Sequence, residues 1–254
     1  PTHSGGSLPE NPVAAILAVS DKMDTLCGCF SVGLIPTGGA DPYALRRQGI
    51  GILQILMDGG YSAPLSAMVE KGLAPFIGEA ALRSQTALAI MDFLKNRMRN
   101  MLSDAGLAKE AVNSALSAAF DNIPDVRLRA RALDELRKEA DFEPLSVTFK
   151  RVENIIRKAG ADSIKAVNPA LFEEDSETAL FKAVEGVTGE VAAAVDGSDY
   201  PGALAAIAQL RPVVDSFFDD VMVMAEDPGL RGNRIALLAS VSGLFSNIGD
   251  FSQI

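Results

Sequence analysis

An apolar repeat of three and four residues runs through most of this chain and restricts what it can fold into. It is clearest in residues 199–224, where the side chains at this spacing are Leu204, Ile207, Leu210, Val214, Phe217 and Val221. The spacing places them on one face of an α-helix, whereas a half-buried strand would alternate every second residue. No such alternation of useful length and no internal repeat occurs. The sequence therefore predicts an all-α fold.

Helix start signals divide the chain further. Asp199 with Pro201, and Asp227 with Pro228, each provide an N-cap residue followed by a proline that the first helical turn accepts. Pro212 lies inside the longest pattern, where it is expected to kink or break the helix. The last helix is expected to bury Ile235, Leu238, Val241, Leu244, Phe245 and Ile248. The other predicted helices are 12–30, 41–57, 79–102, 109–119, 126–140, 144–158 and 177–195.

The length of the chain, 254 residues, is sufficient for one large or two medium domains. The main domain boundary is expected within residues 105–143, after the long helix that ends near Leu102. Apolar runs such as Ile235–Leu238 are far below the ~20 residues that a membrane span requires, so no membrane partner is expected. Because residue 1 is a proline, the chain is expected to be processed or to be part of a longer protein.

The charge changes along the chain. The formal net charge is −10, which argues against a general polyanion binder, and no DNA partner is expected. Residues 95–165 nevertheless carry 14 Lys and Arg against 11 Asp and Glu, whereas residues 166–254 carry 4 against 14. If RNA binds through its phosphates, most of the cationic side chains for it lie in the middle segment.

Groups suited to catalysis or metal binding are few. The only histidine, His3, lies in a Ser/Gly-rich terminus that is expected to be disordered, so no nucleophile–histidine pair and no closed zinc site is predicted. No Walker loop or glycine-rich dinucleotide motif occurs. Cys27 and Cys29 are too close together for an unstrained disulfide, which predicts free thiols in the core and a reducing cytoplasm.

Two segments permit both a functional and a structural interpretation. In residues 36–47 (PTGGADPYALRR), a helix starting at Asp41 could bind an anion through its backbone amides, but Pro42 removes one of them, which favours a structural turn. Asp21 and Asp24 share a helix face and could hold a metal. A solvated face is favoured, because no histidine on an ordered element can join them.

Polar and basic residues of the predicted helix 144–158 share one face. They recur at spacings of three and four residues and are Lys150, Arg151, Asn154, Arg157 and Lys158. The residues expected to face the core instead are Val147, Val152, Ile155 and Ile156. A phosphate-binding face and a solvated face are both compatible with this pattern. Arg127, Arg129 and Arg131 alternate, so they spread around their helix.

Several sequence blocks occur in a characteristic order. They are AVSDKMDTL at residues 18–26, PTGGADPYALRR at 36–47, MDFLKNRMRNML at 91–102, FKRVENII at 149–156 and VDSFFDDVMVMAEDPGLRGNRIALLASVSGLFSNIGDF at 214–251. Together they resemble the beta subunit of the heterotetrameric bacterial glycine–tRNA ligase over nearly the whole chain. The last block also resembles the helical DALR-type anticodon-binding module of other aminoacyl-tRNA synthetases.

The resemblance implies a fold and a division of labour. The fold would be an HD-like helical region in residues 1–104, a helical linker in 105–143 and a DALR-type anticodon-binding bundle in 144–254. In that family the alpha subunit activates glycine with ATP and Mg, and the beta subunit grips glycine tRNA within an α2β2 assembly. The chain is therefore expected to belong to a cytoplasmic ligase of protein biosynthesis, and to contribute no catalytic residue, metal site or cofactor of its own.

The resemblance also implies six tRNA-binding residues. Those that match its basic helix are Lys150, Arg151 and Asn154, and those that match its "LR-NRL" turn are Arg231, Asn233 and Arg234. Arg and Asn side chains can contact base edges as well as phosphates. For Arg234 the alternative is a buried ion pair with Asp219 or Asp220. Two other functions stay open: a structural or subunit-interaction module with little tRNA affinity, and a remnant of a metal phosphohydrolase.

Overall fold

The computed structural model describes residues 8–160 and 166–254. Within these residues it consists of helices and connecting loops without a β-strand, and a single β-bridge joins Thr37 to Ala40. The predicted all-α fold is therefore confirmed. No helix in the described part of the chain is long and apolar enough to cross a membrane.

The helices form two compact units. Unit 1 consists of Pro1–Val112 and Ala119–Arg127, and unit 2 of Asn113–Ala118 and Leu128–Ile254. The chain passes from one unit to the other inside α5 (Lys109–Ala118), again after Ala118, and finally inside α6 (Ile123–Leu136). The expected division at 104 and 143 stays a prediction.

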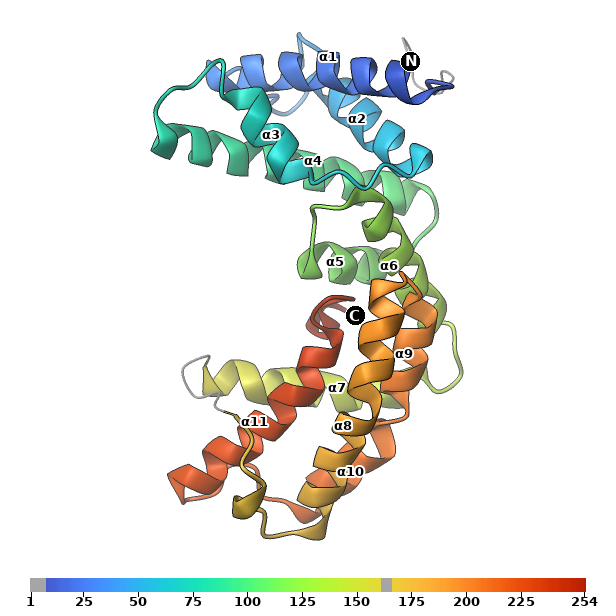
Figure 1. The fold of residues 1–254 in the computed structure, drawn as a ribbon, viewed down its shortest axis with the longest axis vertical. Coiled ribbons are helices and arrows are strands. Elements are labelled where there is room, and N and C mark those ends of the chain that lie inside the picture. Colours follow the sequence, from blue (N-terminus) through green and yellow to red (C-terminus); the bar gives the residue numbers. More distant parts are fainter. Residues whose placement is uncertain (1–7, 161–165) are drawn as a thin grey trace. The chain divides into compact units, whose positions relative to one another are not determined.

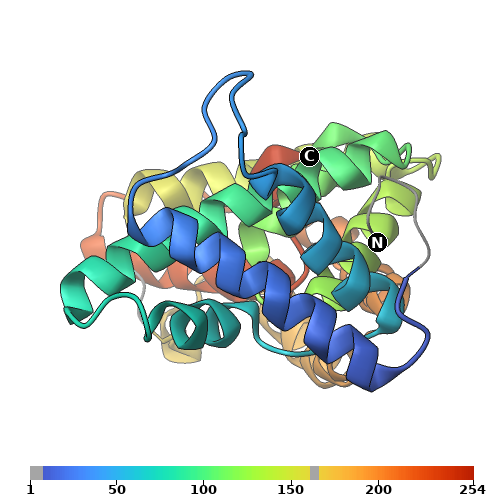
Figure 2. The ribbon, with the colours of Figure 1, turned by 90° about the horizontal axis from the view of Figure 1, so that it is seen from above.

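Unit 1 is built mainly from four helices: α1 (Pro12–Ser31), α2 (Leu45–Gly59), α3 (Leu65–Leu73) and α4 (Ala80–Asp104). Helix α1 contacts the other three, and Figures 1 and 2 show it lying across them. The sequence did not predict α3, because it is short and lacks a capping side chain at its own start. Asp121 supplies the cap instead: its carboxylate and its backbone carbonyl accept from the backbone N–H groups of Ser66 and Leu65.

The start of α2 differs from the prediction. The helix begins at Leu45 rather than Asp41, because Ala44 adopts a left-handed conformation that interrupts it. The Asp41 carboxylate accepts hydrogen bonds from the backbone N–H groups of Leu45 (2.7 Å) and Arg46 (3.0 Å). Arg46 in turn donates to the Gly38 carbonyl oxygen. The amides that an anion would need are thus occupied, as the structural interpretation of this turn predicts.

Unit 2 contains α7 (Phe142–Ala159), α8 (Asp175–Asp196), α9 (Tyr200–Ala208), α10 (Arg211–Asp220) and α11 (Pro228–Phe245), with short 3-10 helices η2 (Pro169–Leu171) and η3 (Phe251–Gln253). Helix α8 runs alongside α9 and α10, and α7 packs against α11 (Figure 1). Three aromatic rings meet between α7, α11 and η3. The ring centroid of Phe245 lies 4.5 Å from that of Phe149 and 4.2 Å from that of Phe251.

The predicted effect of Pro212 is confirmed as a break. Helix α9 ends at Ala208 and α10 begins at Arg211, so Pro212 occupies the first turn of the second helix, where its missing N–H costs nothing. The apolar stripe continues across the break, and all six of its members are buried. Burial of the stripe, rather than an unbroken helix, is what the sequence pattern encodes.

Candidate nucleic-acid interface

The polar and basic face of α7 is accessible over most of its length. Arg151, Asn154, Arg157 and Lys158 are exposed, and Lys150 is half-buried. Arg157 donates to the side-chain oxygen of Asn154 at 2.5 Å, which orders both side chains on the surface. The sequence prediction that these residues share one face of the helix is therefore confirmed.

Arg151 is held in a defined position. Its guanidinium carbon lies 3.9 Å from the ring centroid of Phe218 on α10, and Phe218 is only 8% exposed. Cation–π stacking of this kind fixes the plane of the guanidinium while its other face stays accessible. A second link joins the same helices: the Thr148 hydroxyl donates to Asp215 at 2.6 Å, and Asp215 also pairs with Arg211.

The core-facing side of α7 was predicted only in part. Val147 is 59% exposed, so its expected place in the core is wrong. The residues that anchor the helix are Leu145, Phe149 and Val152, all at most 5% exposed. Because Phe149 enters the aromatic cluster with Phe245 and Phe251, it sets the rotation of the helix and turns Val147 outward.

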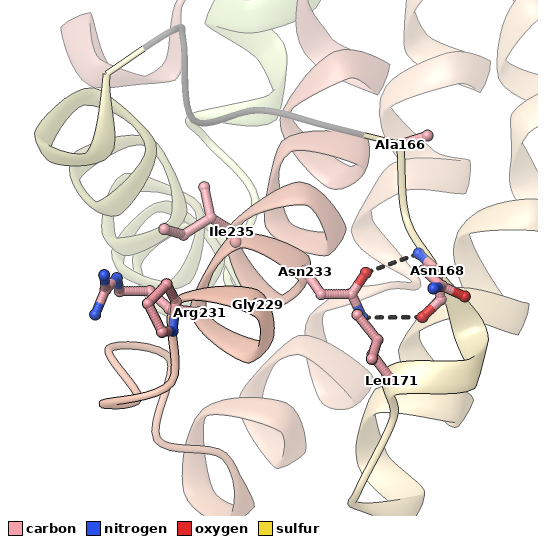
Figure 3. A pocket seen from close by; sticks show the side chains of 9 residues that line it. Ala166, Asn168, Leu171, Gly229, Arg231, Asn233 and Ile235 are labelled. Carbon is pink, nitrogen blue, oxygen red and sulfur yellow. Dashed lines mark hydrogen bonds between the residues drawn. The ribbon is translucent and has the colours of Figure 1, made fainter.

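The first turns of α11 contain the other three predicted residues, and Figure 3 shows two of them pointing in opposite directions. Asn233 is buried and points toward Asn168, just before η2. Its side-chain oxygen accepts from the Asn168 backbone N–H at 2.7 Å, and its amide nitrogen donates to the Asn168 carbonyl at 3.1 Å. Asn233 thus pairs with the backbone in the manner of a neighbouring strand, and this pairing fixes the segment before η2 to α11.

Arg234 lies inside unit 2, with a side chain 6% exposed. Its Nε donates to Glu177 at 3.1 Å, one terminal nitrogen donates to Glu173 at 3.0 Å and the other donates to the Met222 carbonyl at 3.1 Å. The expectation of a buried ion pair is correct in kind, but its partners are these glutamates of the α8 start and not Asp219 or Asp220. The carboxylates that end α10 are near in sequence, whereas the start of α8 is near in space.

Glu177 is the centre of this network. One of its oxygens accepts from Arg234, and the other accepts from the backbone N–H groups of Glu173 (2.8 Å) and Glu174 (3.0 Å). Burial by itself would raise the pKa of Glu177, but the two backbone donors and the Arg234 guanidinium lower it below its ordinary value. Glu177 is therefore a charged acceptor at neutral pH. Sequence reasoning missed it, although a glutamate in the first turn of a helix is a known capping signal.

Arg231 is half-buried and donates to the backbone carbonyl of Ala225 at 2.9 Å. A hollow of about 420 Å³ lies beside it, next to the start of α11. Its lining residues are Ala166, Asn168, Leu171, Pro228, Gly229, Arg231, Gly232, Asn233 and Ile235. The hollow thus presents one guanidinium, several apolar side chains and exposed backbone, a combination that can receive a flat polar group.

The remaining candidates show no site. Cys27 is buried and Cys29 half-buried, and both are free. Asp21 and Asp24 are not buried, and no group of three or more His, Cys, Asp or Glu side chains within residues 8–160 and 166–254 is arranged to hold a metal ion. His3 lies outside the described residues.

Two sequence models of known families match the chain. Residues 1–117 match the model described as glycyl-tRNA synthetase beta subunit, and residues 145–251 match the DALR anticodon binding domain. The second match contains the whole of the α7 face and the start of α11. The helices and these matches define an all-helical protein that carries an anticodon-binding domain.

Curated relatives identify the family. The chain is 54% identical to the glycine–tRNA ligase beta subunit of Desulforapulum autotrophicum, 48% identical to that of Desulfatibacillum aliphaticivorans and 46% identical to that of Geotalea uraniireducens. Each match covers 100% of this chain and 37% of the relative. The chain belongs to the glycine–tRNA ligase beta subunit family, and it spans 37% of the length of these relatives.

Proposed function

We propose that unit 2 binds the anticodon region of glycine tRNA and so supports the ATP-dependent attachment of glycine by a glycine–tRNA ligase. The observation that carries the proposal is the accessible basic face of α7, which lies inside the segment that matches an anticodon-binding domain. Lys150, Arg157 and Lys158 can reach phosphates there. Such contacts fix the position of the RNA, whereas contacts to bases supply discrimination.

The six implied residues divide into two roles in this proposal. Lys150, Arg151, Asn154 and Arg231 contact the RNA directly, and Arg151 offers the open face of a guanidinium on which an unpaired base can stack. Asn233 and Arg234 act from inside, because the amide of Asn233 and the guanidinium of Arg234 already bond neighbouring segments. They position the start of α11, where Arg231 lines the hollow.

In our proposal, another subunit catalyses the ligase reaction. We assign glycine activation, ATP and Mg to an alpha subunit that joins the beta subunit in an α2β2 assembly in the cytoplasm. In this proposal the chain itself takes a non-catalytic part and binds the tRNA. The free thiols of Cys27 and Cys29 fit a reducing compartment.

The proposal is tested by binding of the 254-residue chain to glycine tRNA and to a non-cognate tRNA over a series of salt concentrations. The Lys150→Ala/Lys158→Ala variant is expected to bind more weakly, and the dependence of log K on log salt should flatten by about 0.7–0.9 for each phosphate that is no longer neutralised. Lys182→Ala removes one lysine of unit 2 on α8, and its effect is compared with the effect of the double variant per lysine removed.

Equal effects of Lys182→Ala and of the double variant, per lysine removed, would show general charge attraction and would overturn the assignment to α7. No binding of either tRNA at low salt, where phosphate attraction is strongest, would establish the competing function of a structural or subunit-interaction module.

A further inference from the structure

The segment between α10 and α11 has an unusual distribution of apolar side chains. Its backbone is extended at Val221 and turns at Val223 and Met224. Figure 1 shows this segment as a loop that joins the two helices. Val221 and Val223 are 6% and 7% exposed, whereas Met222 and Met224 are 75% and 60% exposed. The valines explain how the segment is anchored. Nothing in the described part of the chain explains two large apolar side chains held in solvent.

The two methionines are held in place by the arginines of α11. The backbone carbonyl of Met222 accepts from Arg234, and that of Ala225 accepts from Arg231. The Asp227 carboxylate then accepts from the Leu230 backbone N–H and closes the start of α11. The backbone of the segment is therefore fastened before and after Met224, so it presents the two outward side chains from a preorganised backbone and not from a loose loop.

We propose that Met222 and Met224 contact unstacked bases of the tRNA loop that unit 2 binds. This inference rests on the proposed function and assigns the base contacts within it. A methionine side chain is flexible and polarisable, and its sulfur packs favourably against aromatic rings, which suits the faces of splayed bases. Both residues lie within the segment that matches the anticodon-binding domain, and the arginines of α11 bond the backbone of this segment.

The charge around the methionines favours bases over phosphates. Asp219, Asp220 and Glu226 lie on either side of the pair in the sequence and repel the RNA backbone. Carboxylates can accept hydrogen bonds from exocyclic amino groups, such as N4 of cytosine. Glycine codons begin with a pair of guanines, so glycine anticodons carry a pair of cytosines. A surface of methionines and carboxylates therefore suits cytosine bases that point toward it, while the basic face of α7 binds the phosphates.

The test compares variants of the 254-residue chain in binding to glycine tRNA. Met222→Ala/Met224→Ala is expected to weaken binding about five- to tenfold, because two apolar side chains no longer pack on the rings. The slope of log K against log salt should stay unchanged, because every cationic side chain remains. Met222→Leu/Met224→Leu keeps the apolar volume and should retain most of the affinity. Leu88→Ala is the control, since Leu88 is 68% exposed on α4 in unit 1.

A second measurement addresses the bases. Glycine tRNA with uracils in place of the anticodon cytosines should bind more weakly to the unmodified chain, and the Met222→Ala/Met224→Ala variant should discriminate less between the two RNAs. Unchanged affinity and discrimination in this variant would overturn the inference. The proposed function would still stand if Lys150→Ala/Lys158→Ala weakened binding, and it would fail by itself if the unmodified chain bound no tRNA. Loss of alpha-subunit binding alone in the methionine variant would assign the pair to a protein interface and overturn the inference as well.

Discussion

Arg234 provides the sharpest test of how unit 2 is held together. Replacing it with methionine keeps much of the side-chain volume but removes the positive charge from a site that is 6% exposed. The Glu177 carboxylate, only 1% exposed, would then keep two backbone donors and lose its counter-ion. Removing one partner of a buried ion pair typically costs about 3–5 kcal/mol, and we expect a loss of stability in this range for Arg234→Met.

Two further variants distinguish the contribution of the buried Glu177 carboxylate to stability from that of the exposed Glu173 carboxylate. Glu173 bonds the same arginine but is 57% exposed, so Glu173→Gln should cost less than about 1 kcal/mol. Combining Arg234→Met with Glu177→Gln removes the uncompensated charge. The double variant is therefore expected to be more stable than Arg234→Met alone, with a coupling of about 0.5–3 kcal/mol between the two positions.

The loss of stability caused by Arg234→Met should also depend on pH. Because the pKa of Glu177 in the folded protein is lowered, its contribution to stability is complete above the ordinary glutamate pKa of about 4.3 and is lost as the pH falls through the lower folded value. The difference between the unmodified chain and Arg234→Met should accordingly be largest near neutral pH and shrink in acid.

Urea denaturation followed by hydrogen exchange in peptides from α8 and α11 would measure these changes within unit 2. A loss below about 1 kcal/mol for Arg234→Met, or equal losses for Glu173→Gln and Arg234→Met, would refute the reasoning, since neither fits a buried counter-ion.

Two more predictions concern the cores. Phe149→Ala should destabilise unit 2 by about 3–5 kcal/mol, because it opens a cavity among three rings. Val147→Ala should change the stability by less than about 0.5 kcal/mol in the same denaturation assay. Similar losses for both variants would contradict the observed orientation of α7. Burial, assisted by the negative charge of Asp24, raises the pKa of Cys27 to about 12. In a Cys29→Ser variant the remaining thiol should therefore resist iodoacetamide at mildly alkaline pH until urea unfolds the chain, and rapid native alkylation seen by mass spectrometry would be the opposite result.

The sequence pattern was most informative where burial alone decides a structure. The stripe from Leu204 to Val221 predicted a buried helical face, and Pro212 predicted its interruption. The expectation for Val147 was wrong because Val147 precedes Lys150 and Arg151 by three and four residues, so the helical spacing itself places it on their exposed face. What the local sequence could not show is the anchor of the opposite face: Phe149 packs against Phe245 and Phe251, which come from the far end of the chain.

The sequence predicted which types of residue form the candidate site, but not which of them are buried. Arginine and asparagine in a turn indicate polar contacts, yet nothing in the local sequence states whether those contacts are with RNA or with the protein. Arg234 and Asn233 face inward because Glu177 and Asn168, which are distant in the sequence, provide their partners. The exposure of Met222 and Met224 could not be predicted either, since an alternating valine–methionine run can bury either the valines or the methionines.

The way in which α5 is shared limits how the anticodon-binding domain can be moved between proteins. Residues 113–118 belong to unit 2: the Ser114 carbonyl accepts from the Asp250 backbone N–H, and the buried Arg129 donates to the Ala115 carbonyl. Gly249 packs so closely that an added methyl group would clash with the Ser114 hydroxyl oxygen. A fragment cut at the limits of the sequence match, 145–251, would therefore lack residues 113–118, which pack inside unit 2. The module that evolution could transplant, or that an engineer could graft, begins upstream of α5 and includes all three passages of the chain between the two units.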